Sequence, residues 1–203
     1  MIAISFYTAN GKYPALASRL RKSCERFDLR HKIVEAPQQD CWHRTINLKP
    51  GFILQSLLDA REPVLWLDCD CEIRQPPKLL SNVAMTGTDF AVYNWQAHGD
   101  YDGSEITNSG GVSYWAYTAP VLDLLIRWQF ACQNNPLAVD DETLDYVWKH
   151  FRPPVKPLWL PKEYNWMWSN GPQDPVIERA FGPVPDDCVI WHDYVGGKHG
   201  EAA

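Results

Sequence analysis

Two aspartates that directly follow a short apolar run give the clearest chemical signal in the sequence. Asp68 and Asp70 come after residues 64–67, Val-Leu-Trp-Leu, which read as a buried strand. Side chains two positions apart in an extended segment point the same way, so both carboxylates can meet one ion. Oxygen ligands of this kind suit Mg²⁺ or Mn²⁺. Because Asp-x-Asp pairs also arise by chance, the position directly after the strand is what favours a metal role.

A histidine near the C-terminal end of the sequence gives the second signal. His192 ends the apolar run 189–191 and is followed by Gly196, Gly197 and Lys198. Imidazole can bind a metal, glycines let backbone N–H groups approach an anion, and lysine adds a point charge. The alternative is a tail with an unrelated histidine and glycines.

Three further segments carry polar groups that could contact a ligand. Asp140 and Asp141 stand at the start of an expected helix, where helix capping and the helix dipole already explain acidic residues. Asn108 opens an Asn-Ser-Gly-Gly segment, which is either a turn or a close approach of the backbone to a ligand. Lys49 precedes Pro50 and is either a phosphate contact or a surface lysine.

The elements expected around these residues alternate between strands and helices. Strands are expected at residues 2–8, 31–35, 64–67, 90–95, 110–117 and 189–191, and helices at Pro14, Pro50, Pro120 and 141–150. This alternation predicts βαβ units and a mostly parallel sheet. Ligands of such sheets bind beyond the carboxyl ends of the strands. Residues 153–185, rich in Pro, Asn, Gly and Trp, are expected to form ordered loops.

Composition narrows the class of protein. The chain has 203 residues, 45% of them hydrophobic, enough for one domain with its own core. A net charge of −6 argues against a surface that binds nucleic acid through its phosphates. The basic residues between 19 and 32 are interpreted as the solvated face of a helix. The six cysteines form no CxxC pair, which favours free thiols. No apolar stretch is long enough for a membrane span, and we expect a cytoplasmic protein.

Taken in order, these motifs resemble those of the nucleotide-diphospho-sugar transferases, and most closely the retaining GT-A glycosyltransferases of the glycogenin and lipopolysaccharide galactosyltransferase kind. The resemblance runs from residue 4 to residue 198 and is carried by Tyr7-Thr8-Ala9-Asn10 with Tyr13, Leu65 to Asp70, Asn108 to Val112, Asp140 to Leu144, Leu160 to Trp166, and His192 to Lys198. Three positions depart from the family pattern. Asp193 separates His192 from Tyr194, Asp141 stands where the family often has Gln, and His199 follows Lys198.

The resemblance implies an α/β protein with one GT-A (Rossmann-like) domain over residues 1–203, whose mostly parallel central sheet is flanked by helices. It implies transfer of a sugar from a nucleotide-diphosphate donor, expected to be a UDP-sugar. The acceptor would be a saccharide, a protein or a small molecule, with a DNA base less favoured. Mn²⁺ or Mg²⁺ would be bound by Asp68, Asp70 and His192.

The resemblance also assigns residues to the donor and to catalysis. Nucleotide-sugar contacts would come from Tyr7, Thr8, Ala9, Asn10, Tyr13, Lys49, Asp68, Gly196, Gly197 and Lys198. The catalytic candidates are Asn108, Asp140 and Asp141, with Asp141 the nucleophile if retention uses a covalent intermediate; front-face attack is the alternative. Two other functions stay open: a catalytically inactive sugar-nucleotide-binding protein, and a metal-dependent phosphohydrolase that uses the same two aspartates.

Overall fold

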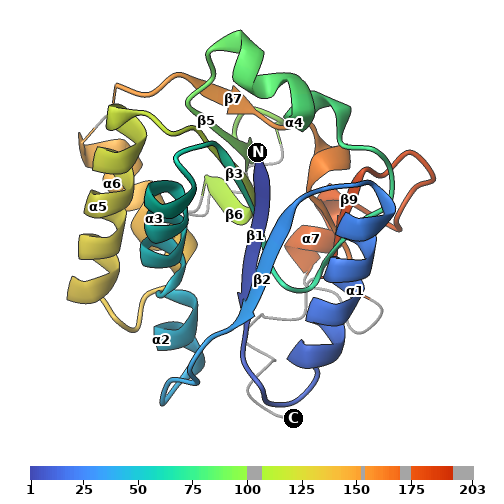
Figure 1. The fold of residues 1–203 in the computed structure, drawn as a ribbon, viewed down its shortest axis with the longest axis horizontal. Coiled ribbons are helices and arrows are strands. Elements are labelled where there is room, and N and C mark those ends of the chain that lie inside the picture. The colour runs from blue at the N-terminus through green and yellow to red at the C-terminus, as the bar shows by residue number, and fades with distance from the viewer. Residues whose placement is uncertain (100–106, 152–153, 170–174, 194–203) are drawn as a thin grey trace.

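A mixed six-stranded sheet forms the centre of the molecule (Figure 1). The computed structural model describes residues 1–99, 107–151, 154–169 and 175–193. The strand order is β2-β1-β3-β6-β5-β7. All strands run in one direction except β6, which pairs antiparallel with both neighbours. The strands are β1 (Ile2–Tyr7), β2 (His31–Glu35), β3 (Val64–Leu67), β5 (Phe90–Asn94), β6 (Asn108–Trp115) and β7 (Pro157–Trp159). The expected mostly parallel sheet is therefore confirmed.

Helices cover both faces of this sheet. Helix α1 (Tyr13–Arg26) packs on one face, and α3 (Lys49–Ala60), α5 (Ala119–Asn134) and α6 (Asp140–Phe151) pack on the other (Figure 1). Shorter helical segments are α2 (Trp42–Ile46), α4 (Lys78–Val83), η1 (Ala84–Thr86), η2 (Lys162–Tyr164) and α7 (Pro175–Ala180). Within the described ranges, no helix is long and apolar enough to cross a membrane.

The central strand β3 shows why this sequence forms a two-sided core. Successive side chains of a strand point to opposite faces of the sheet. Leu65 and Leu67 accordingly join the core under α1, while Val64 and Trp66 join the core under α3 and α5. Because helices lie on both faces, all of β3 is buried and its sequence is continuously apolar.

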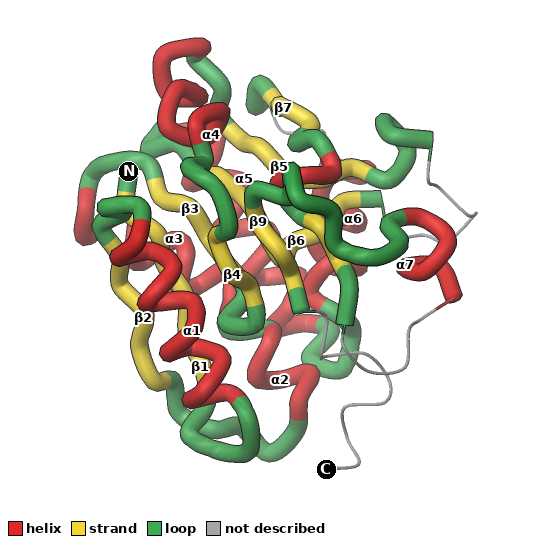
Figure 2. Tube along the Cα trace, turned by 90° about the vertical axis from the view of Figure 1, so that its right-hand side faces the viewer, coloured by secondary structure: helices red, strands yellow, loops and turns green. Residues whose placement is uncertain are grey.

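A second, smaller sheet begins directly after β3. It contains β4 (Cys71–Ile73), β9 (Ile190–His192) and β8 (Trp166–Met167), in the order β4-β9-β8. Strands β4 and β9 lie side by side (Figure 2) and are antiparallel, with Cys71 opposite His192 in the register. This pairing brings the end of β9 to the turn that follows β3.

The structure corrects several expectations about the elements. Residues 153–185 were expected to be loops, but their described part contains β7, η2, β8 and α7. These elements are too short to show a periodic pattern. Leu58, which the apolar spacing of residues 53–58 would place on the buried face of α3, is 43% exposed. Strand β6 begins at Asn108, two residues earlier than expected, so the Asn-Ser-Gly-Gly segment is part of the sheet rather than a turn.

Candidate active site

Asp68 and Asp70 lie in a tight turn between β3 and β4, and not in the extended segment that the sequence suggested. The N–H of Cys71 donates to the carbonyl of Asp68 at 2.9 Å and closes this turn. The N–H of Asp68 donates to the carbonyl of Gly111 on β6 at 2.8 Å. The turn is thereby fixed at the carboxyl end of β3, the edge where doubly wound sheets bind ligands.

His192 lies between the two carboxylates. Its Nε2 is 3.3 Å from Oδ1 of Asp70 and 3.7 Å from Oδ2 of Asp68. Ligands held at about 2.1 Å from one octahedral ion are about 3 Å apart, so this spacing suits a shared divalent cation. Burial alone lowers the pKa of His192, but the charges of Asp70 and Asp68 outweigh it, and the pKa is raised. The structure therefore brings His192 within 3.7 Å of both carboxylates, and the metal role of the three residues stays a prediction.

The neighbouring thiol is a less suitable ligand. Single ligand atoms of Asp70, Cys71 and His192 lie within 4.8 Å of one another. Burial, followed by the charges of Asp70 and Asp68, raises the pKa of the Cys71 thiol well above its usual value. The thiol contacts the carbonyl of Gly111 at 3.7 Å. Mn²⁺ and Mg²⁺ prefer oxygen ligands and imidazole to a thiol, so the carboxylates and His192 are the better candidates to hold one of these ions.

Lys49 is buried between two acidic groups and is not a surface lysine. It is 4% exposed, and its Nζ lies 2.5 Å from Oδ2 of Asp140 and 3.1 Å from Oδ1 of Asp68. Burial lowers the pKa of Lys49, but Asp140, Asp68 and Asp141 outweigh this effect and hold it well above its usual value. Trp66 Nε1 donates to the same Asp68 Oδ1 at 2.8 Å. Lys49 thus faces carboxylates within the protein.

The acidic start of α6 does more than cap the helix. Glu142 accepts from the N–H of Val139 at 3.2 Å, which is the capping contact. Asp140 instead pairs with Lys49, and Oδ1 of Asp141 accepts from the N–H of Gly110 at 2.8 Å. Burial, followed by the charge of Asp140, raises the pKa of Asp141 well above its usual value. Both aspartates therefore belong to the cluster around Asp68.

The structure places Asn108 in a supporting position. The side chain is fully buried, its Nδ2 donates to Oδ1 of Asp145 at 2.7 Å, and its Oδ1 accepts from Asn94 at 2.9 Å. Both ends of the amide are thus used within the protein, and a contact between Asn108 and a substrate stays a prediction. Asp145 was not singled out from the sequence, although it lies one turn after Asp141 on the same helix face.

Gly111 allows β6 to pass close to the histidine. A Cβ at this position would overlap the His192 ring, lying 2.6 Å from Nδ1, and would be 3.4 Å from Oδ2 of Asp68. The close approach that the sequence suggested for this Gly-Gly pair is thus made to the side chains of the site itself.

The loop after β1 borders the same edge of the sheet. Thr8 is buried, Ala9 and Asn10 are exposed, and Tyr7 is half-buried. Burial, followed by electrostatic interactions with Cys69 and Asp70, raises the pKa of Tyr13. Gly196, Gly197 and Lys198 lie outside the described residues.

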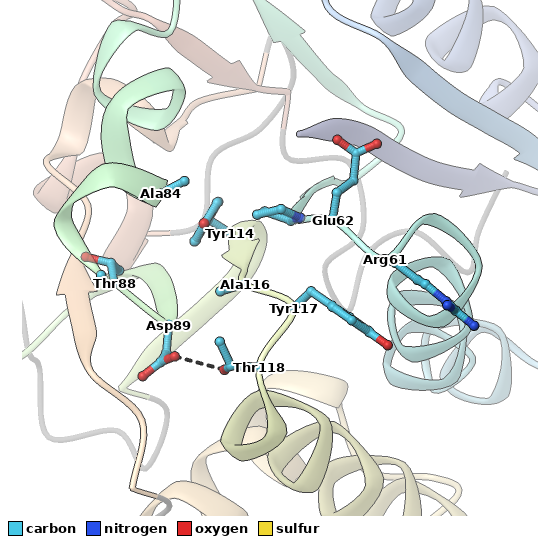
Figure 3. A pocket seen from close by; sticks show the side chains of 11 residues that line it. Arg61, Glu62, Ala84, Thr88, Asp89, Tyr114, Ala116, Tyr117 and Thr118 are labelled. Atoms are coloured by element: carbon cyan, nitrogen blue, oxygen red, sulfur yellow. Dashed lines mark hydrogen bonds between the residues drawn. The ribbon is translucent and has the colours of Figure 1, made fainter.

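A hollow of about 330 Å³ lies at the other end of β3, near the start of this strand (Figure 3). Its lining includes Glu62 and Asp89, which precede β3 and β5, together with Tyr114 near the end of the antiparallel β6. The hollow is therefore separated from Asp68 by the length of β3. None of the residues that the sequence singled out for chemistry lines it.

Comparison with known proteins shows the fold. No family model and no curated protein sequence matches the chain. A crystal structure of a glycosyltransferase involved in the glycosylation of the major capsid of PBCV-1 superposes with a TM-score of 0.69, at 12% identity over 96% of this chain and 94% of that one. Mouse xyloside xylosyltransferase 1 in its apo form gives a TM-score of 0.57, at 12% identity over 95% and 97%. The chain therefore has the α/β fold of the GT-A glycosyltransferases.

Proposed function

We propose that the chain is a metal-dependent glycosyltransferase that takes a sugar from a nucleotide-diphosphate donor, with a UDP-sugar as the preferred donor. The observation that carries this proposal is the convergence of Asp68 and Asp70 on His192 at the carboxyl end of β3. A fold shared with glycosyltransferases supports it. Proteins of one fold catalyse many different reactions, so the function is inferred from the residues of the site.

The residues present fit Mn²⁺ or Mg²⁺. Asp68, Asp70 and His192 would hold the ion with hard oxygen atoms and one imidazole. When bound, the ion neutralises the charge that develops on the departing diphosphate. The side chain of Asp68 is already oriented for this by Trp66 and Lys49.

The remaining residues would bind and orient the donor. The loop of Thr8, Ala9 and Asn10, with Tyr7 and Tyr13, would bind the nucleoside. In support, this loop follows β1 at the carboxyl end of the strand, where doubly wound sheets bind ligands. Asp141, fixed by the N–H of Gly110, is proposed to orient the sugar. Asp140 and Lys49 hold this end of α6 against the acidic turn. The acceptor would be a saccharide, a protein or a small molecule.

Thermal stability with UDP, GDP and their sugars, each with and without Mn²⁺, tests the donor site. Ligand at about 100 times its Kd adds about 2.7 kcal/mol of stability. For a chain of this size that corresponds to a shift of roughly 5–10 °C. We expect the full shift only when Mn²⁺ and one nucleotide are both present, and a smaller shift with Mn²⁺ alone. No shift with any nucleotide at millimolar concentration would contradict the proposal.

The products formed from the donor without an acceptor separate the three functions. A transferase that uses water slowly as acceptor cleaves the bond between the sugar and the diphosphate, and releases the free sugar and UDP. A phosphohydrolase cleaves the phosphoanhydride and releases UMP and a sugar phosphate. Nucleotide binding without any cleavage, with or without candidate acceptors, would indicate a binding protein.

A further inference from the structure

Arg19 links the two chain segments that supply the metal-ligand candidates. It projects from α1, and its side chain is only 28% exposed. Its Nη2 donates to the backbone carbonyl of Asp70 at 2.8 Å, and its Nη1 donates to Oδ2 of Asp193 at 2.9 Å. We infer that Arg19 is a positioning residue that holds Asp70 and His192 at the separation the metal needs. This inference rests on the proposed metal-dependent function.

The contacts use the planar shape of the guanidinium. A guanidinium presents several N–H donors in a fixed fork, whereas an ammonium is a point charge. In Arg19 one branch reaches the turn before β4 and the other reaches the residue after β9. The N–H of Asp193 also donates to the carbonyl of Asp70, at 3.1 Å. The carbonyl of Asp70 thus accepts two hydrogen bonds, one from Arg19 and one from the N–H of Asp193.

Arg19 also packs over the strands themselves. Its guanidinium lies 4.7 Å from the centre of the Trp191 ring, and its Nε lies 4.0 Å from Oε2 of Glu72. Glu72 and Trp191 are opposite each other in the β4–β9 register. The indole Nε1 of Trp191 donates to the carbonyl of Trp168 at 2.7 Å. Arg19 therefore contacts both strands of the pair on one face.

The position of these contacts explains why they should affect the affinity of the site for a metal ion. Strands β4 and β9 pair over only three residues, from Cys71 opposite His192 to Ile73 opposite Ile190. The ends of short ladders open most easily. Asp70 and His192 both lie at one end of this ladder, and Arg19 closes that end. Residues that orient metal ligands without touching the metal commonly change metal affinity when they are replaced.

This role also gives a reason for Asp193, one of the three positions at which the sequence departs from the pattern it resembles. Asp193 stands between His192 and Tyr194, where the resembling sequences place tyrosine directly after histidine. Its side chain is 11% exposed and its carboxylate is paired with Arg19. The added residue thus supplies the anion that holds Arg19 beside the site.

A titration of the folded protein with Mn²⁺ alone, followed by the electron paramagnetic resonance signal of the free ion, tests the inference. We expect Arg19→Met to weaken Mn²⁺ binding about 10- to 100-fold. Arg26→Met is the matched control, because it removes the same charge from the same helix at an exposed position, where the guanidinium lies 3.9 Å from Glu72. Its Mn²⁺ affinity should stay within about twofold of the original chain.

A second variant keeps the test decisive if Arg19→Met does not fold. Asp193→Asn removes only the carboxylate charge, and we expect it to weaken Mn²⁺ binding as well. The double variant should bind no more weakly than Arg19→Met, because both changes break the same link. Unchanged Mn²⁺ affinity in folded Arg19→Met, or in Asp193→Asn if that variant alone folds, would overturn the positioning role and leave the proposed function standing. Absence of Mn²⁺ binding by the original chain would overturn both.

Discussion

Lys49 and Asp140 form a buried ion pair, with Nζ 2.5 Å from Oδ2, and the same ammonium lies 3.1 Å from Asp68. Lys49 is the first residue of α3, Asp140 is the first residue of α6, and Asp68 follows β3. One side chain therefore joins two helix starts to the turn that carries the metal-ligand candidates. The geometry of the site and the stability of the fold should depend on it together.

Replacing Lys49 by Met should destabilise the protein. The change leaves the carboxylate of Asp140, which is 5% exposed, without its partner, and breaking a buried pair in this way costs about 3–5 kcal/mol. Urea unfolding measures the loss. The variant Lys49→Met/Asp140→Asn should recover part of the lost stability, because the unpaired charge is gone.

Lys32→Met is the control. It removes an exposed lysine that pairs with Asp59 and should change stability by less than about 0.5 kcal/mol. A loss for Lys49→Met as small as this would mean that the pair contributes little.

The substitutions Asp68→Asn and Asp70→Asn should each abolish metal-dependent function while leaving the fold intact. The amide introduced by Asp68→Asn would keep an oxygen for Trp66 Nε1, so the local hydrogen bond can persist. We expect sugar transfer or donor hydrolysis to fall at least about 100-fold, together with the Mn²⁺-dependent thermal shift. Far-UV circular dichroism checks the fold, and Asp59→Asn provides an exposed control. Full activity of either variant at saturating Mn²⁺ would rule that aspartate out as a ligand.

The raised pKa of His192 predicts opposite pH trends for metal binding and for metal-free stability. Asp70 and Asp68 favour the protonated ring, so its stabilising effect is complete below the unfolded value of about 6.5 and is lost as pH rises through the raised folded pKa. Mn²⁺ needs the neutral ring, so Mn²⁺ affinity should rise over the same range.

Mn²⁺ titrations and urea unfolding without metal, from about pH 6 to about pH 9, check both trends. His192→Gln removes the titrating ring and should flatten both profiles. Mn²⁺ affinity that is constant across this range in the original chain would argue against His192 as a ligand.

Alanine at Gly111 should disturb the site more than alanine at another glycine. The added Cβ would overlap the His192 ring and so push it away from Asp70. We expect Mn²⁺ affinity to fall at least about tenfold. Gly51→Ala is the matched control, because its Cβ meets only the flexible Gln129 side chain and helix α3 gains about 1 kcal/mol of propensity. Equal Mn²⁺ affinity in the two variants would contradict the close-packing argument.

Much of the fold was predictable because it follows from local patterns. The apolar run of β3, the β2 segment at residues 31–35 and the helix at Pro120 all occur as expected. Leu58 was misplaced because sequence periodicity does not show how much of a helix flank the neighbouring elements cover. The antiparallel direction of β6 depends on its pairing partners and has no signature in its own residues.

The ligand candidates were predictable from the sequence, but their supports were not. Asp68, Asp70 and His192 each sit at the end of an apolar run, a signal that can be read along the chain. Lys49 was expected to be either a phosphate contact or a surface lysine, and Arg19 to be part of a solvated helix face. Their roles depend on partners far away in sequence, since Arg19 and Asp193 are 174 positions apart. The composition of the chain and the spacing of its residues do not predict such contacts.

The pairing of β4 with β9 also determines when this site can exist during synthesis. Asp68 and Asp70 leave the ribosome long before His192 and Asp193, so a growing chain has two carboxylates in place without their histidine. Distant contacts of this kind form late in folding. A nascent chain that has not yet reached β9 should be unable to retain Mn²⁺, even with its central sheet assembled. Metal capture would then be coupled to the completion of β9, and a chain interrupted before that strand would hold no cofactor.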